Sequence, residues 1–319
     1  MAKPSDQAKP ASGHANYVEI TIHFRCNLRC QHCMILDSMR WLTPATEEEF
    51  EGLLEENRRE RKWTGLILTG SEVTLMPDLP SFAARARASG FEHVRIQTHG
   101  MRLSDPKVCQ RLIEAGVDEY FVSLTADEEH LHDEITGVPG SFRKTLAGIR
   151  NLDAFAGVKI LTNTVVTGLS YRSLPGVVRL LADVKNLVEM DFWTYWPMKE
   201  TDDSALPVSH LESGPFLREA IRLAEGLGRR VEVKNFPHCL LGSEGHALLN
   251  DQPELRIDPR FWTEFHRNGF HQCVYREVCG SKQCLGLNAA YVDRFGWHES
   301  DLVPMPRAAD ASQTSPRPS

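Results

Sequence analysis

The chain has 319 residues, 41% of them hydrophobic, which is enough to bury one large domain and a smaller one. A formal net charge of -7 argues against a nucleic-acid-binding protein, and no apolar run is long enough to span a membrane. The polar N-terminal residues lack the apolar core of a secretion signal. We therefore expect a cytoplasmic protein whose eight cysteines are metal ligands or catalytic thiols.

Short β-branched runs alternate with amphipathic helical patterns along most of the chain. Helix starts are signalled by a capping box from Thr46 to Glu49, by Asp105-Pro106, by Ser141 and by Pro175, and Leu217 belongs to a sixth helix. Six consecutive βα units predict an α/β fold with a parallel sheet and right-handed crossovers. The predicted strands are 17–25, 65–69, 93–98, 119–124, 159–166 and 188–195.

Composition divides the chain into four parts. Residues 1–16 and 303–319 are rich in Pro, Ala and Ser, which predicts disorder. The βα units occupy residues 17–228. Residues 229–302 hold four of the eight cysteines and form the predicted second domain.

Three cysteines, Cys26, Cys30 and Cys33, follow the first predicted strand with the spacing C-x3-C-x2-C. A four-iron cluster has four corners, so three thiolates from one loop can hold it and leave one iron open to a small molecule. The alternative is zinc, which normally takes two close pairs of cysteines or cysteines with suitably spaced histidines. One triplet fits zinc poorly, and we favour the iron–sulfur cluster.

The run Cys26-Asn-Leu-Arg-Cys30-Gln-His-Cys33 resembles the signature of the radical S-adenosylmethionine (radical SAM) superfamily. The resemblance implies a partial (βα)6 TIM-like barrel with its chemistry at the carboxyl ends of the strands. It also implies a [4Fe-4S] cluster whose open iron chelates S-adenosylmethionine. One electron from the cluster then cleaves the sulfonium, and the 5′-deoxyadenosyl radical removes a hydrogen atom from a substrate.

The same resemblance suggests cofactor-binding residues at the ends of later strands. Gly70-Ser71-Glu72 is similar to the family's Gly-Gly-Glu turn, in which a carboxylate and backbone carbonyls bind the methionyl ammonium. The second glycine is replaced here by Ser71. The other cofactor-binding residues that the resemblance implies are Ser123, Arg143 and Asn163.

A second set of cysteines, Cys239, Cys273, Cys279 and Cys284, lies within about fifty residues and suggests one metal site. The layout resembles the auxiliary-cluster extensions of SPASM or twitch type, which carry a second [4Fe-4S] cluster. Structural zinc with four cysteines is the alternative. Cys239 is remote from the other three, so it is either the fourth ligand, which we favour, or a hydrogen-atom donor.

Several further residues are open to two interpretations. His99 either lines the substrate cavity or caps a strand end, and Trp193 or Tyr195 is a candidate wall of the substrate pocket. We expect Cys109 to be a buried structural thiol and the pair His130 and His132 to lie at the surface.

The sequence therefore predicts an oxidoreductase-like radical SAM enzyme acting on an unactivated C–H bond of a small metabolite, sugar or peptide. Dehydrogenation or cross-linking would follow if an auxiliary cluster accepts an electron. Epimerisation through Cys239, sulfur insertion, and a non-catalytic iron–sulfur or zinc redox sensor are the alternatives. The implied electron donor is a flavodoxin or ferredoxin, and no nucleic-acid or membrane partner is expected.

Overall fold

A single curved sheet of eight parallel strands runs through residues 16–307, the part of the chain that the computed structural model describes. The order across the sheet is β7-β6-β5-β4-β3-β2-β1-β8, so β7 and β8 lie at its two edges. The strands are β1 (Tyr17–His23), β2 (Gly65–Gly70), β3 (His93–Thr98), β4 (Glu119–Ser123), β5 (Lys159–Val166), β6 (Leu187–Thr194), β7 (Arg230–Lys234) and β8 (Glu254–Arg256).

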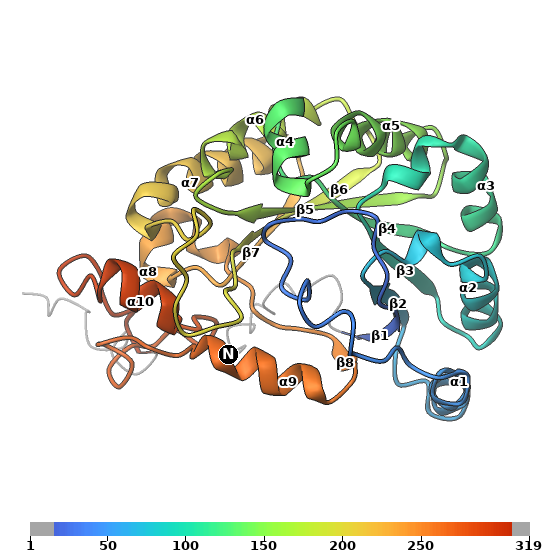
Figure 1. The fold of residues 1–319 in the computed structure, drawn as a ribbon, viewed down its shortest axis with the longest axis horizontal. Helices are drawn as coiled ribbons and strands as arrows, with labels where there is room; N and C mark the ends of the chain where they lie inside the picture. Colours follow the sequence, from blue (N-terminus) through green and yellow to red (C-terminus); the bar gives the residue numbers. More distant parts are fainter. Residues whose placement is uncertain (1–15, 308–319) are drawn as a thin grey trace, which may run out of the picture.

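Helices cover the outer face of this sheet (Figure 1). The curved sheet with its outer helices is an open, partial TIM-like barrel, as the sequence predicted. The helices are α1 (Glu47–Glu60), α2 (Leu79–Ala88), α3 (Pro106–Glu114), α4 (Glu129–Thr136), α5 (Ser141–Asp153), α6 (Leu174–Leu180), α7 (His210–Gly226), α8 (His238–Leu241), α9 (Arg260–Phe265) and α10 (Ala289–Phe295).

Local signals in the sequence set the helix ends. At α1, the Glu49 amide donates to the Thr46 hydroxyl over 3.2 Å and the Thr46 amide donates to the Glu49 carboxylate over 2.7 Å, which is the predicted capping box. Asp105 caps α3, which has Pro106 in its first turn and is followed by Gly116 in a left-handed conformation. These predicted helix starts are confirmed.

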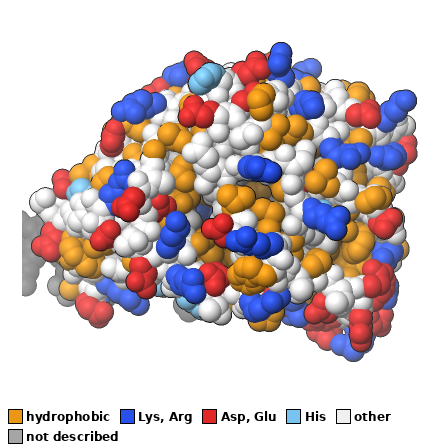
Figure 2. Space-filling model, in the orientation of Figure 1, with side chains coloured by type: hydrophobic (Ala, Val, Ile, Leu, Met, Phe, Trp, Pro, Cys, Tyr) orange, Lys and Arg blue, Asp and Glu red, His pale blue; other side chains and the backbone are white. Residues whose placement is uncertain are grey.

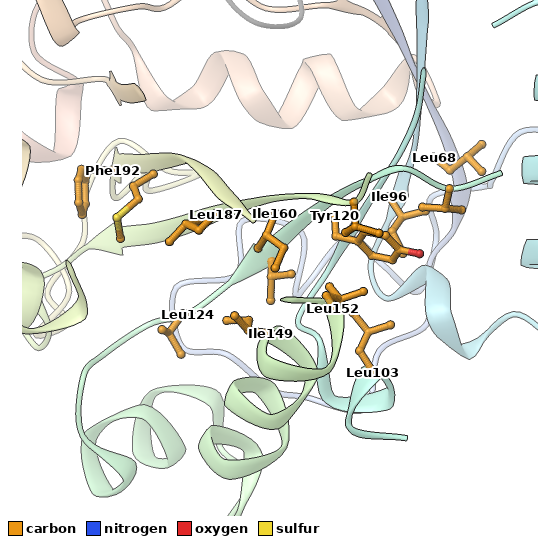
Figure 3. Close-up of a cluster of buried hydrophobic side chains, with 14 of the residues drawn as sticks. Leu68, Ile96, Leu103, Tyr120, Leu124, Ile149, Leu152, Ile160, Leu187 and Phe192 are labelled. Atoms are coloured by element: carbon orange, nitrogen blue, oxygen red, sulfur yellow. The ribbon is translucent and has the colours of Figure 1, made fainter. Parts of the chain in front are cut away.

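The hydrophobic core lies between the sheet and the outer helices. Apolar side chains on one face of the strands, including Leu68, Ile96 and Tyr120, pack toward Leu103 and Leu152 (Figure 3). The opposite face of the strands lines the interior of the half-barrel, because successive side chains of a strand point to opposite faces.

The sequence predicted six strands, and the structure adds β7 and β8. Both belong to the same sheet: β7 pairs with β6, and β8 pairs with β1. The chain therefore crosses from one sheet edge to the other within the segment assigned to a second domain. Residues 1–15 and 308–319, which make up most of the two segments predicted to be disordered, lie outside the described residues. No helix in residues 16–307 is long and apolar enough to cross a membrane.

Candidate metal and cofactor site

The first cysteine triplet lies in a loop that leaves the carboxyl end of β1 and crosses the concave side of the sheet (Figure 1). Backbone hydrogen bonds fix this loop at both ends. The amide of Glu72 donates to the carbonyl of Arg25 over 3.0 Å, and the amides of Arg29 and Gln31 donate to the end of α4 over 2.9 Å each. The loop is thus held between the ends of β2 and α4, at the rim where barrels of this kind carry their chemistry.

The thiols of Cys26, Cys30 and Cys33 are partly buried and free. Burial raises the pKa of Cys26 to about 11 and of Cys30 to about 12, and a charge on Cys33 raises both pKa values further. The three groups are therefore close enough to repel one another as thiolates. Such a cluster of thiols becomes a stable set of anions only beside a compensating cation, and this donor set fits an iron–sulfur cluster.

The turn after β2 approaches the cysteine loop closely. A Cβ atom at Gly70 would overlap the carbonyl oxygen of His23, so only glycine fits there without a shift of the backbone. The amide of Ser71 donates to that same carbonyl over 2.8 Å. The Ser71 hydroxyl is buried and has no hydrogen-bond partner in the described part of the chain, which leaves it available to a ligand in the loop.

The carboxylate of Glu72 is fully buried (0% exposed) and accepts hydrogen bonds from other residues of the chain. It accepts hydrogen bonds from the amide of Thr74 over 3.0 Å, the hydroxyl of Thr98 over 2.7 Å and the amide of His99 over 2.8 Å; the Thr74 hydroxyl also donates to it. The predicted contact of this carboxylate with the methionyl ammonium stays a prediction. Its observed partners tie the end of β2 to the end of β3.

His99 extends this network to the cysteine loop. The amide of Met101 donates to His99 Nδ1 over 3.2 Å, so the ring hydrogen lies on Nε2, which is 2.8 Å from Asn27 Oδ1 and 3.1 Å from the Glu72 carboxylate. Burial lowers the pKa of His99 and keeps the ring neutral. Of the two roles considered for His99, these contacts match that of capping a strand end. The ring also forms a hydrogen bond with Asn27, the residue after Cys26.

Two of the other predicted cofactor residues lie side by side in the barrel. Ser123 ends β4, and Asn163 is its register partner on β5. Asn163 is 8% exposed, and none of the residues that the structure describes donates a hydrogen bond to its Oδ1 atom. Arg143 lies elsewhere: its side chain is 75% exposed on α5 and forms a 3.0 Å ion pair with Glu129 of α4.

The second set of cysteines comes together although Cys239 is far from the others in sequence. Cys239 follows β7 in α8, and its thiol lines one pocket together with those of Cys273, Cys279 and Cys284. Burial raises the pKa of Cys239, and the neighbouring Cys284 and Cys273 raise it further. All four thiols are free.

Backbone amides point at two of these sulfur atoms. The amide of Gly286 donates to Cys284 Sγ over 3.4 Å, and the amide of Met305 donates to Cys279 Sγ over 3.3 Å. Met305 belongs to the segment assigned to the tail by composition. N–H donors of this kind stabilise metal-bound thiolates. Four thiols in one pocket fit either of the two predicted metal centres, a [4Fe-4S] cluster or a structural zinc ion.

Other predictions about single residues have mixed outcomes. Cys109 is buried, with its thiol donating to the carbonyl of Leu103, as expected. His130 is exposed, but the surface position predicted for His132 is wrong: its side chain is 1% exposed. The polar residues around His132 suggested a position at the surface. The neighbouring Asp133, however, accepts a hydrogen bond from the Phe142 amide in the first turn of α5, and this contact packs α4 against α5. Trp193 faces the barrel interior and packs against Phe121.

Sequence reasoning missed a group of charged residues inside the barrel. Glu189 and Asp191 on β6 and Glu232 on β7 are buried, and their carboxylates lie within 4.8 Å of one another. Each alternates with apolar residues that face the helices, a pattern that could have revealed a polar interior. These buried carboxylates do not reach the surface drawn in Figure 2, where several Lys and Arg side chains lie around the middle of the face seen in Figure 1.

Comparisons with known proteins agree with this geometry. The chain is 26% identical over 239 residues to Fe-coproporphyrin III synthase of Methanosarcina barkeri, and the match covers 72% of this chain and 58% of that protein. The structure of SuiB from Streptococcus suis bound to S-adenosylmethionine has a TM-score of 0.54 at 14% identity, covering 68% of this chain and 49% of that one. Methylornithine synthase (PylB) has a TM-score of 0.53 at 14% identity, covering 93% of this chain and 80% of that one.

The chain spans little more than half of the first of these proteins, and the two structural likenesses concern the fold alone. The family assignment comes from a further comparison. A model of the radical SAM superfamily matches residues 20–181, just over half of the chain. The match includes the first cysteine triplet, the turn after β2 and the strands β3 to β5. This protein therefore belongs to the radical SAM superfamily.

Proposed function

We propose that this protein removes a hydrogen atom from an unactivated C–H bond of a small metabolite, sugar or peptide. A [4Fe-4S] cluster with S-adenosylmethionine would supply the 5′-deoxyadenosyl radical when bound. Cys26, Cys30 and Cys33 would hold this cluster. The observation that carries the proposal is the convergence of three free thiols in a fixed loop at the carboxyl end of β1.

The chain offers polar groups for S-adenosylmethionine beside that loop. Ser71 has a buried, unpartnered hydroxyl next to the cysteine loop, and Asn163 has an unpartnered oxygen inside the barrel. Gly70 allows the turn after β2 to approach the loop closely. We assign Gly70, Ser71 and Ser123 to cofactor binding. Asn163 stays a predicted cofactor residue whose oxygen is also open to a substrate, and the surface ion pair of Arg143 makes it the weakest member of the predicted set.

We further propose that Cys239, Cys273, Cys279 and Cys284 hold an auxiliary [4Fe-4S] cluster. Their common pocket and the amide donors at Cys279 and Cys284 support this assignment. Cys239 lies close enough to Cys273 and Cys284 for their charges to affect its pKa, which favours the role of fourth ligand over that of hydrogen-atom donor. The auxiliary cluster would then accept the electron of the substrate radical, giving dehydrogenation or cross-linking.

Relatives with the same fold include a protein solved with its precursor peptide and a methylornithine synthase, so both peptides and small metabolites are represented. We propose a substrate from these classes, and a flavodoxin or ferredoxin in the cytoplasm as electron donor. The barrel interior holds the buried carboxylates of Glu189, Asp191 and Glu232, which favours a polar substrate.

The test is anaerobic reconstitution of the full chain, followed by iron counting and an assay for 5′-deoxyadenosine under reductant. We expect about eight iron atoms per chain, about four after the triple change of Cys26, Cys30 and Cys33 to Ala, and 5′-deoxyadenosine only from the unchanged protein. Bound zinc in place of iron, or iron binding without any 5′-deoxyadenosine, would instead identify a zinc protein or a redox sensor.

A Cys239→Ala variant separates the two roles of that thiol. Loss of about four iron atoms supports ligation. Full iron content with lost turnover supports hydrogen-atom donation, and incorporation of solvent deuterium into the product would then identify an epimerase.

A further inference from the structure

One row of side chains crosses the interior of the barrel from β4 to β7. The strand register pairs Ser123 with Asn163, Asn163 with Asp191, and Asp191 with Glu232. Register partners on parallel strands point to the same face of the sheet, and the residues that flank Ser123, Asp191 and Glu232 belong to the core on the helix side. The four side chains therefore project inward at one level of the barrel.

Most of the charges near this row are already paired. Arg230 pairs with Glu189. The Lys234 ammonium lies 3.4 Å from the Glu232 carboxylate and donates to the carbonyls of Leu249 and Asp251 over 2.8 and 3.2 Å, so its three hydrogens are used.

Among residues 16–307, no cation lies within hydrogen-bond distance of Asp191. Its one donor in this part of the chain is Trp193, whose Nε1–H lies 3.0 Å from Oδ2. The carboxyl group is 2% exposed. Burial, and then the charge of Glu232, raise the pKa of Asp191, and together they outweigh the opposing charges of Lys234 and Arg95.

The unpartnered atoms of the row are all acceptors. They are Oδ1 of Asn163, Oδ1 of Asp191 and Oε1 of Glu232, which accept no hydrogen bond from residues 16–307, although Arg230 Nε lies 4.0 Å from the Glu232 oxygen; each of the three residues is more than nine-tenths buried. A buried oxygen without a donor costs free energy, so three adjacent ones favour a ligand with several N–H donors. Asn163 is not an acid, yet its Oδ1 atom also lacks a hydrogen-bond donor among the described residues.

We propose that Asn163, Asp191 and Glu232 bind a protonated amino group of the substrate. An ammonium carries three N–H donors and one positive charge, which matches three acceptors and one unpaired carboxylate. A divalent cation fits less well, because Arg230 and Lys234 already compensate the charges of Glu189 and Glu232 and leave only the charge of Asp191, which matches a monovalent ligand. The inference rests on the proposed function and specifies its substrate class as amines, which include amino acids, polyamines and peptides with a free amino group.

The experiment uses the full chain, reconstituted anaerobically, with n-butylammonium as the probe and n-butanol as its uncharged counterpart. Binding is measured by saturation-transfer NMR for the unchanged protein, for Asp191→Asn and for Asp183→Asn, a control at an exposed carboxylate. We expect Asp191→Asn to weaken n-butylammonium binding by about tenfold or more, because a charge-assisted hydrogen bond is lost. We expect Asp183→Asn to leave it unchanged and n-butanol to bind all three proteins equally weakly.

Two further measurements keep the inference open to refutation. S-adenosylmethionine affinity should be unchanged in Asp191→Asn, and its loss together with unchanged amine binding would assign the row to the cofactor. Asp191-dependent Mn²⁺ binding, seen by electron paramagnetic resonance, would make the row a metal site. If Asp191→Asn does not fold, Asp191→Ser provides the same comparison. Amine binding needs no cleavage of S-adenosylmethionine, so failure of this inference and failure of the proposed function are separate results.

Discussion

The buried carboxylate of Glu72 offers the sharpest test of how the cysteine loop is held. In Glu72→Gln, one carboxylate oxygen becomes an NH2 group. The oxygen of the new side chain would stay with Thr74 and Thr98, since Oε1 accepts from both residues. The NH2 group would then face the amide and the ring Nε2–H of His99, which are donors themselves.

The expected loss of stability follows from these contacts. One charge-assisted hydrogen bond, from the His99 amide, is replaced by a contact between two donors, and each such bond contributes about 1.5–3 kcal/mol. We expect a loss of about 3 kcal/mol, which lowers the melting temperature of a chain of this size by about 5 °C. Because His99 also holds Asn27, the iron content after reconstitution should fall as well.

The assay is differential scanning calorimetry of the metal-free protein together with iron counting, and Glu92→Gln serves as control at an exposed carboxylate. The control should leave both values unchanged. If Glu72→Gln kept its melting temperature and iron content but lost affinity for S-adenosylmethionine, the carboxylate would be a direct cofactor ligand. A purely structural role of the Glu72 carboxylate would then be wrong.

Three further changes test the fold around the site. Gly70→Ala should cost several kcal/mol, on the order of an overpacked core position, because its Cβ overlaps the His23 carbonyl; unchanged thermal unfolding would contradict this. Thr46→Ala should cost about 1 kcal/mol in urea unfolding by removing the capping box of α1, and an unchanged midpoint would show that the cap is not needed. Burial raises the pKa of Glu19 to about 7 in the folded protein. Between about pH 4.5 and 7 the folded chain keeps a proton that the unfolded chain has lost, so stability should fall as the pH rises through this range. Glu19→Gln should abolish up to about 3 kcal/mol of that decline, and identical pH profiles for the two proteins would refute the assignment.

The six predicted strands could be recognised because each is a run of β-branched or aromatic residues. β7 and β8 gave no such signal: β7 alternates Arg230, Glu232 and Lys234 with two valines, and β8 has only three residues. Charged residues usually indicate an exposed edge. Here β7 is an edge strand whose charged side faces the barrel interior, where Lys234 and Glu232 pair, so the polarity of the segment concealed its place in the sheet.

The candidate metal ligands stand out in the sequence more clearly than the residues that support them. The first cysteine triplet is local, so its spacing alone suggests a site. The contact of Cys239 with Cys273 and Cys284 depends on the tertiary fold, and only the scarcity of cysteines suggested it. Asp191 and Asn163 become neighbours through strand register, which a single sequence does not reveal.

The arrangement of the cysteine loop has a consequence for cluster binding. The loop is continuous only with β1, yet hydrogen bonds join it to β2 through Arg25, to β3 through Asn27 and to α4 through Arg29. Three elements that carry no cysteine therefore help to set the relative positions of three thiols. Since ligands must be held within a narrow range of geometry, changes at His99 or at the end of α4 should weaken iron binding while leaving every cysteine in place.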